Sequence, residues 1–147
     1  MTSKGLPEAT RKKLIEYLES IDFVDFAILF GSLACGKPHP GSDCDLGIAT
    51  NQEFSLLEIG FLVARLEEIV GREVDLVIVN DLPSRNPALA FEVARGELLF
   101  ARDSARFVAF KEKAFLRFLD TQFLRNLLNQ ALLQRIEEGR FGKRSAS

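Results

Sequence analysis

The sequence predicts an α/β (α+β) fold, in which a small mixed β-sheet is flanked by helices and followed by C-terminal helices. Up to about residue 100, short apolar runs bounded by turn residues alternate with amphipathic helical segments, and the last third is helical in pattern. At 147 residues, without repeats or linkers, the chain has the size of one domain. We expect a single domain over 1–147, with a core over about 7–100 and C-terminal helices over about 104–138.

Helices are expected wherever apolar residues recur at intervals of three and four. The predicted segments are about 7–20, about 50–70, 87–95 and 104–138. Thr50 and Glu53 have the spacing of a capping box at the start of the second segment, and Gly71 stops it. The last segment is expected to form either one helix or two that meet near Asp120 and Thr121. The tail after Glu138 is expected to fray.

Strands are expected in the short apolar runs between these helices. They cover residues 26–30, 43–48 and 74–79, with an edge strand at 98–100. In the second run Asp43, Asp45 and Gly47 alternate with apolar residues, which gives this strand a polar face. The third run is apolar apart from Asp75, so we expect a buried acid there that has a functional reason.

Composition narrows the classes of function. A net charge of −2 shows no positive excess for binding a long nucleic acid. No stretch approaches the roughly 18 consecutive apolar residues of a membrane span, so we expect a soluble, cytoplasmic protein. The two cysteines, Cys35 and Cys44, have no His cluster beside them, and we expect reduced thiols rather than a disulfide framework or a zinc site.

The polar residues converge on one site. Gly31-Ser32 follows the first strand, Asp43 and Asp45 lie on one face of the next, and Asp75 lies in a third. Alternate carboxylates on a strand are about 6.6 Å apart and repel by about 2.5 kcal/mol at an effective dielectric constant of about 20, which favours a cation between them. Carboxylates suit Mg²⁺, and two such ions can hold the attacking and leaving oxygens of a phosphoryl displacement.

A glycine turn suits the other half of such a site. Gly31 lets the backbone approach a triphosphate, and the Ser32 hydroxyl and following N–H groups can donate to phosphate oxygens. Asp75 is placed to accept the proton of an acceptor hydroxyl.

This motif resembles that of the polymerase-β-like nucleotidyltransferase superfamily. It comprises Gly31-Ser32, ten intervening residues, Asp43-Cys44-Asp45, and Asp75 within Glu-Val-Asp-Leu-Val. The small size is similar to the minimal nucleotidyltransferase branch, the MNT or MntA-like antitoxins encoded beside HEPN-domain toxins. The resemblance covers the first hundred residues or so and implies the nucleotidyltransferase fold. It also implies transfer of AMP from ATP to a tyrosine hydroxyl of a HEPN-family toxin.

The resemblance also implies a role for each motif residue. Asp43, Asp45 and Asp75 would bind Mg²⁺, as two ions, with Asp75 also acting as the base, and Gly31 and Ser32 would hold the ATP phosphates. Many relatives have an arginine shortly before the loop glycine, where this chain has Cys35 before Gly36. That phosphate contact would be missing or supplied by Lys37.

Less specific interpretations apply to several of these residues. Asp75 could instead be satisfied by a buried salt bridge to Arg72 or Arg95. We interpret His39 as a solvated loop residue and Ser42 as a cap or loop hydrogen-bonding group, because no base partner for a nucleophile is visible.

Two other functions compete with the enzymatic one. The same fold could neutralise the toxin by binding alone, or it could modify a small molecule as antibiotic-modifying enzymes do. The small-molecule enzymes usually add a helical domain, for which the roughly seventy residues after Asp75 leave little room. The C-terminal half is rich in phenylalanine at 107, 110, 115, 118 and 123, which we interpret chiefly as core. From Phe115 to Leu133 the apolar residues exceed one helix stripe, so one face is expected to dock either a partner or a second copy.

Overall fold

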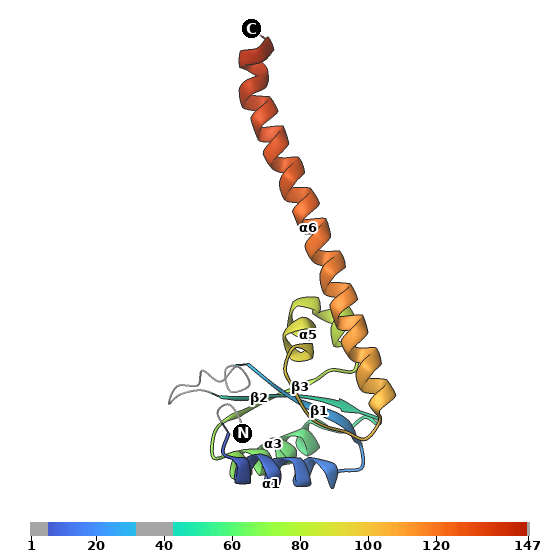
Figure 1. Ribbon diagram of the computed structural model, residues 1–147. Helices are drawn as coiled ribbons and strands as arrows, with labels where there is room; N and C mark the ends of the chain where they lie inside the picture. Colours follow the sequence, from blue (N-terminus) through green and yellow to red (C-terminus); the bar gives the residue numbers. More distant parts are fainter. Residues whose placement is uncertain (1–5, 32–42, 147) are drawn as a thin grey trace.

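A four-stranded mixed sheet forms the centre of the protein, as a computed structural model shows (Figure 1). The structure describes residues 6–31 and 43–146, and the side chains in these ranges other than those of residues 123 and 139–146. The strands are β1 (Val24–Phe30), β2 (Cys44–Thr50), β3 (Val74–Ile78) and β4 (Glu97–Ala101), in the spatial order β3-β2-β1-β4. The predicted mixed sheet is confirmed.

The strand directions follow from the connections. β1 is antiparallel to both β2 and β4, whereas β2 and β3 are parallel and joined through helix α3 (Leu56–Val70). β1 is buried along its whole length because it has a strand on each side and helices on both faces. β4 lies at one edge, as predicted, and β3 lies at the other.

Helices cover both faces of the sheet (Figure 1). One face carries α1 (Glu8–Glu19) and α3. The other carries α4 (Leu82–Arg85), α5 (Pro87–Ala94) and the first turns of α6 (Ser104–Ala146). The single turn α4 was not predicted from the sequence. Within the described residues, no helix is long and apolar enough to cross a lipid bilayer.

Period-two alternation in the strands divides the core into two layers. Leu46 and Ile48 of β2 pack toward α1 and α3, against Leu14, Leu18 and Leu66. On the opposite face, β1, α5 and α6 contribute a cluster that contains Phe26, Ile28, Val93 and Phe110. Ring contacts join α6 to β1 and to α5 in this second layer. Phe26 lies 5.4 Å from Phe107, and Phe91 stacks on Phe118 with 4.0 Å between centroids. The interpretation of Phe107, Phe110 and Phe115 as core is confirmed. Phe118 is half-buried against Phe91 of α5, and Phe123 lies outside the described side chains.

The predicted capping box at Thr50 and Glu53 was wrong. The box is formed by Ser55 and Glu58, whose side chains each accept from the other's backbone N–H at 3.2 and 2.7 Å. Thr50 belongs to the end of β2, where its hydroxyl accepts a hydrogen bond from Asn80 at 2.9 Å. The predicted end of α3 is confirmed, since Gly71 has φ of 76° and caps the helix in the left-handed conformation.

α6 is one helix of 43 residues, not two that meet near Asp120 and Thr121. The junction contains no proline or glycine, and the Thr121 hydroxyl donates to the Arg117 carbonyl inside the helix at 3.0 Å. The helix also continues through the predicted frayed tail to Ala146.

A buried acid fastens the start of α6 to the sheet. Asp25 is only 7% exposed, accepts from Asn51 Nδ2 at 2.8 Å and forms an ion pair with Arg106 of α6. Arg106 also donates to the Thr50 carbonyl at 2.8 Å. Burial by itself would raise the pKa of Asp25, but the hydrogen bonds from Asn51 and Arg106 and the charges of Arg106 and Arg102 hold that pKa below its ordinary value.

Asp25→Asn is therefore expected to destabilise the fold in a pH-dependent way. A folded-state pKa below the unfolded value means that the ionised group stabilises the fold above its ordinary pKa near 3.8 and loses this effect as the pH falls through the lower folded value. We expect a loss of about 1–3 kcal/mol at pH 7 that disappears once the pH falls below the folded-state pKa of Asp25, measured by urea unfolding at each pH.

Glu68→Gln is the matched control for Asp25→Asn. Glu68 pairs with Arg65 at 3.0 Å, but the two side chains are 69% and 62% exposed. Removal of this exposed pair should change stability by less than about 0.5 kcal/mol. Equal losses for the two variants, or a loss for Asp25→Asn that persists at acid pH, would contradict the assigned role of Asp25.

Candidate functional site

Two of the three predicted acids occupy neighbouring positions in the sheet. Asp45 on β2 is directly opposite Asp75 on the parallel strand β3. Side chains at paired positions project from the same face, and adjacent strands are about 4.8 Å apart. Asp45 alternates with Cys44 and Leu46, which pack under α1 and α3, so both carboxylates lie on the face that carries α4, α5 and α6. Asp43 immediately precedes β2 and is exposed.

Backbone hydrogen bonds around the start of both strands hold this register. Cys44 N–H donates to the Glu73 carbonyl at 2.8 Å, and Val74 N–H donates to the Glu67 carboxylate at 3.0 Å. Glu67 belongs to the last turn of α3, so the helix directly positions the strand that carries Asp75. Sequence reasoning missed Glu67, because an acid on an amphipathic helix gives no signal that it caps a strand.

A glycine in β2 brings a helix close to the acids. A Cβ atom at Gly47 would lie 2.7 Å from Cγ1 of Val93 in α5 and 3.2 Å from Cγ1 of Val79. α5 therefore packs on this face two residues from Asp45 only because position 47 has no side chain. Sequence reasoning placed Gly47 on the polar face but did not give it this packing role.

The predicted phosphate turn starts against the carboxylate of Asp45. Gly31 directly follows β1 and has φ of +80°, a left-handed conformation that residues with a Cβ atom rarely adopt. Phe30, the residue before it, pairs with Asp45 across the antiparallel strands. A Cβ atom at Gly31 would lie 3.1 Å from Cγ of Asp45 and would overlap its Oδ2. The turn and the acid are therefore in direct contact.

The charge at this position is concentrated. The pKa of Asp45 is raised above its ordinary value by burial first, and then by the negative charges of Asp75 and Asp43. Each of the three acids therefore contributes to one local negative potential, which favours the binding of a cation at this end of the sheet.

Asp75 is exposed, and the prediction that it is buried was wrong. β3 is the edge strand, so only one side of Asp75 is covered by a neighbouring strand. An apolar sequence around an acid does not reveal whether its strand is central or at the edge. Arg95, one suggested partner, instead pairs with Glu92 at 3.5 Å.

Several predicted residues lie outside the described part of the chain. These are Ser32 and Lys37, both expected at the phosphates, together with Cys35, His39 and Ser42. The other cysteine, Cys44, is a buried free thiol in the α1–α3 layer. Burial, followed by the charge of Asp45, raises the pKa of Cys44 to about 12, which makes this thiol a packing group and not a nucleophile.

The donor chemistry of the site fits a magnesium ion. Among the described residues, no group of three or more His, Cys, Asp or Glu side chains is gathered closely enough to hold a metal ion by itself. Magnesium does not require such a cage, because it commonly takes one or two carboxylates and completes its shell with water and nucleotide phosphates. Asp45 and Asp75 would supply two hard oxygen ligands in register to such an ion, and Asp43 adds negative charge beside them.

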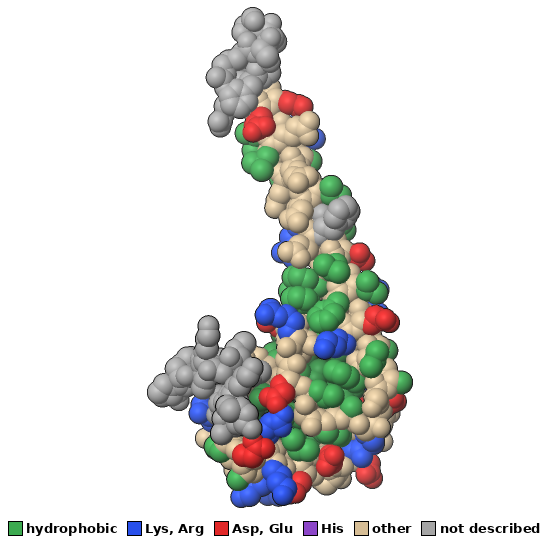
Figure 2. Space-filling view, in the orientation of Figure 1, with side chains coloured by type: hydrophobic (Ala, Val, Ile, Leu, Met, Phe, Trp, Pro, Cys, Tyr) green, Lys and Arg blue, Asp and Glu red, His purple; other side chains and the backbone are tan. Residues whose placement is uncertain are grey.

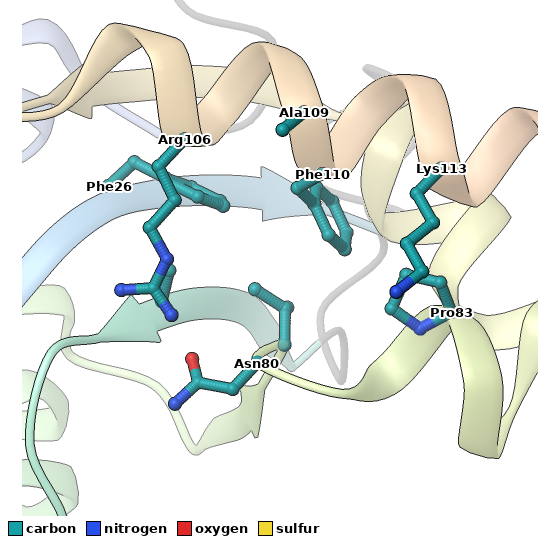
Figure 3. Close-up of a pocket in the computed structure, with 9 residues that line it drawn as sticks. Phe26, Asn80, Pro83, Arg106, Ala109, Phe110 and Lys113 are labelled. Atoms are coloured by element: carbon teal, nitrogen blue, oxygen red, sulfur yellow. The ribbon is translucent and has the colours of Figure 1, made fainter.

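A separate pocket lies at the opposite end of β2 and β3. Figure 3 shows Arg106, Phe110 and Lys113 of α6 above Asn80 and Pro83. Its floor includes Ala49 of β2, four residues beyond Asp45 and so about 13 Å along the strand. None of the described site residues, Gly31, Asp43, Asp45 and Asp75, lines this pocket, so it is distinct from the acidic site.

Comparison with known families identifies the chain. The family described as "Polymerase beta, Nucleotidyltransferase" matches residues 12–105. This range includes β1, β2 and β3 and the three site acids, Asp43, Asp45 and Asp75. The chain belongs to this family. It is accordingly a nucleotidyltransferase, with the fold that the sequence motif predicted.

Solved structures share the fold of this nucleotidyltransferase. A chain in a toxin–antitoxin crystal structure with AMP-PNP has 23% identity and a TM-score of 0.64, and the match covers 87% of this chain and 99% of that one. A chain in the complex of tri-AMPylated HEPN toxin with MNT antitoxin from Shewanella oneidensis has 20% identity and a TM-score of 0.62, with coverage of 86% and 98%. A chain in a mutant MntA toxin–antitoxin complex has 22% identity and a TM-score of 0.67, with coverage of 84% and 98%. No curated protein matches the sequence closely enough to count as a relative.

Proposed function

We propose that this nucleotidyltransferase is an antitoxin that transfers AMP from ATP to a tyrosine hydroxyl of a HEPN-family toxin, with Mg²⁺ bound by Asp43, Asp45 and Asp75. The observation that carries this proposal is the pairing of Asp45 with Asp75 beside the Gly31 turn, in a member of a nucleotidyltransferase family. Solved chains of the same fold come from toxin–antitoxin pairs, one with AMP-PNP and one with an AMPylated toxin.

In the proposed reaction, the tyrosine oxygen attacks the α-phosphorus of ATP while the bond to the β-phosphate oxygen breaks. The products are a tyrosine–AMP phosphodiester and pyrophosphate. Asp75 accepts the hydroxyl proton, and the turn of Gly31 and Ser32, with Lys37, binds the phosphates. Bound magnesium would supply charge stabilisation for the attacking and leaving oxygens.

The openness of the acidic site favours a macromolecular acceptor. Asp75 is exposed on an edge strand, and Asp43 is exposed at the start of β2. A tyrosine on the surface of another protein can reach such a site directly. Enzymes that act on small molecules usually bury most of the acceptor in a pocket, and the pocket beside Asn80 and Arg106 lies about 13 Å from Asp45 along β2.

Label transfer tests the proposal. The purified chain is incubated with Mg²⁺, ATP labelled at the α-phosphate, and a HEPN-family toxin. We expect the label on a tyrosine of the toxin and at least about a 100-fold slower transfer by Asp75→Asn.

Asp81→Asn is the matched control, because Asp81 is an exposed acid just beyond the other end of β3 that makes no side-chain cap to α4.

The outcomes separate the competing functions. A toxin that is bound and neutralised but never labelled would favour an antitoxin that acts by binding alone. Label on a small hydroxyl compound but not on protein would favour the small-molecule enzyme. Transfer that continues without a divalent cation would contradict the roles proposed for the three acids.

A further inference from the structure

The far half of α6 presents an unpartnered apolar surface. The ring contacts of α6 extend as far as Phe118, which stacks on Phe91 of α5, and beyond it the helix projects away from the rest of the protein (Figure 1). Every described side chain from Gln122 to Glu138 is exposed. Leu124, Leu127 and Leu128 are 57%, 46% and 63% exposed. Hydrophobic side chains are visible along this projecting segment (Figure 2), and a surface of this kind on a soluble helix indicates a binding partner.

Eight residues define one face of this helix, which we name the α6 seam. They follow one another at intervals of three or four, apart from the adjacent pair at the centre: Arg117, Asp120, Leu124, Leu127, Leu128, Ala131, Arg135 and Glu138. At about 100° per residue they fall within an arc of about 100°, the spacing of a coiled-coil contact face. The seam is apolar in the middle and charged at both ends.

The order of residues along the seam is self-complementary in the antiparallel sense. A two-fold axis between Leu127 and Leu128 sets these leucines opposite each other and sets Leu124 opposite Ala131. The same axis sets Asp120 opposite Arg135. At the ends of the seam it sets Arg117 opposite Glu138. Each apolar residue meets an apolar residue and each charge meets its opposite, and symmetry makes every pair occur twice.

Other ways of pairing two seams lack this complementarity. A parallel pair would place Asp120 beside Asp120 and Arg135 beside Arg135, with like charges in contact. An antiparallel pair shifted by seven residues in one direction would set Leu127 opposite Arg135. The opposite shift would set Asp120 opposite Leu128. Of these four arrangements, only the central antiparallel register places leucines opposite apolar residues and charges opposite their counter-charges.

The charges at the ends of the seam are available for such pairing. Within the described part of the chain, Arg117, Asp120 and Arg135 form no ion pair, and Glu138 only accepts a hydrogen bond from Gln134 at 3.1 Å. We infer that the α6 seam binds the α6 seam of a second copy of this chain, in an antiparallel pair centred between Leu127 and Leu128. This interface is independent of the nucleotidyl transfer proposed above.

A charge-exchange experiment on the full chain tests this pairing. The variants are Asp120→Arg and Arg135→Asp, both exposed positions beyond the packed part of α6. Each variant alone would face itself with two repulsive pairs, whereas a mixture of the two would restore opposite charges at both positions. By sedimentation equilibrium, we expect wild type to dimerise, each variant to associate at least about tenfold more weakly, and their equimolar mixture to recover most of the wild-type affinity.

Three results would overturn the inference. The first is a wild-type chain that remains monomeric up to about 1 mM, whether or not the seam binds a toxin. The second is dimerisation of both single variants at wild-type strength. The third is a mixture that associates no better than its components. Thermal unfolding of each variant checks that the fold is intact, and Leu128→Ala provides a second variant that should weaken the dimer without changing any charge.

Discussion

Asp45→Asn is expected to abolish nucleotidyl transfer and, at the same time, to stabilise the metal-free protein. Asparagine has nearly the same shape as aspartate, but it removes a charge that burial, Asp75 and Asp43 all disfavour. We expect the free energy of unfolding in EDTA to rise by roughly 1 kcal/mol, as measured by urea denaturation. Transfer should fall by at least about 10³-fold, because the amide provides a much weaker ligand for magnesium.

In the presence of magnesium, wild type should become more stable than Asp45→Asn. The ion is expected to raise the melting temperature of wild type and to have a much smaller effect on Asp45→Asn, since binding to the folded state stabilises it. Asp81→Asn, the control acid beyond the other end of β3, should behave as wild type in both respects. If Asp45→Asn proved less stable than wild type in EDTA, the carboxylate would have a structural role and the repulsion inferred here would be absent.

Gly31→Ala has the second large expected effect. Alanine must adopt a φ of +80° and place its methyl group where the Asp45 carboxylate lies. The left-handed conformation alone costs about 1–2 kcal/mol, and displacement of the carboxylate by about 1 Å should lower the rate of transfer by about 100-fold. Urea unfolding and the label-transfer assay measure the two effects separately.

Gly60→Ala is the matched control for Gly31→Ala. Gly60 lies within α3, and an added Cβ atom would meet nothing within 4 Å. This change should stabilise the protein by about 0.5–1 kcal/mol and leave transfer unchanged. If Gly31→Ala retained wild-type activity, the contact between the turn and Asp45 would have no catalytic importance.

The strands and the ends of most helices could be predicted from the sequence because local chemistry determines them. Alternation in residues 43–48 correctly placed Asp45 and Gly47 on the face opposite Cys44 and Leu46. Gly71 marked the end of α3 because only glycine readily takes the left-handed cap. The start of α3 was misplaced because Thr50 and Ser55 both have acids three residues later. Only tertiary contacts, the pairing of Thr50 with Val24 of β1 and the hydrogen bond from Asn80, assign Thr50 to the strand.

Strand order was the part of the site that the sequence could not supply. The proximity of Asp45 to Asp75 depends on the parallel pairing of β2 with β3, and the exposure of Asp75 depends on β3 being the outermost strand. Both are relations between distant segments, and neither leaves a pattern within its own strand. The motif spacing indicated that the acids act together, but it could not say that one of them would be open to solvent.

The position of β1 has a consequence for how the two substrates would be held. β1 is buried from end to end between two strands, and Gly31 follows its last residue, so the proposed triphosphate turn is anchored to the most constrained segment of the sheet. Asp75, the proposed proton acceptor, lies on a border strand with one free side. The nucleotide would thus bind beside a buried central strand. The incoming hydroxyl would approach at the edge strand, where an acceptor as large as a folded protein can be accommodated.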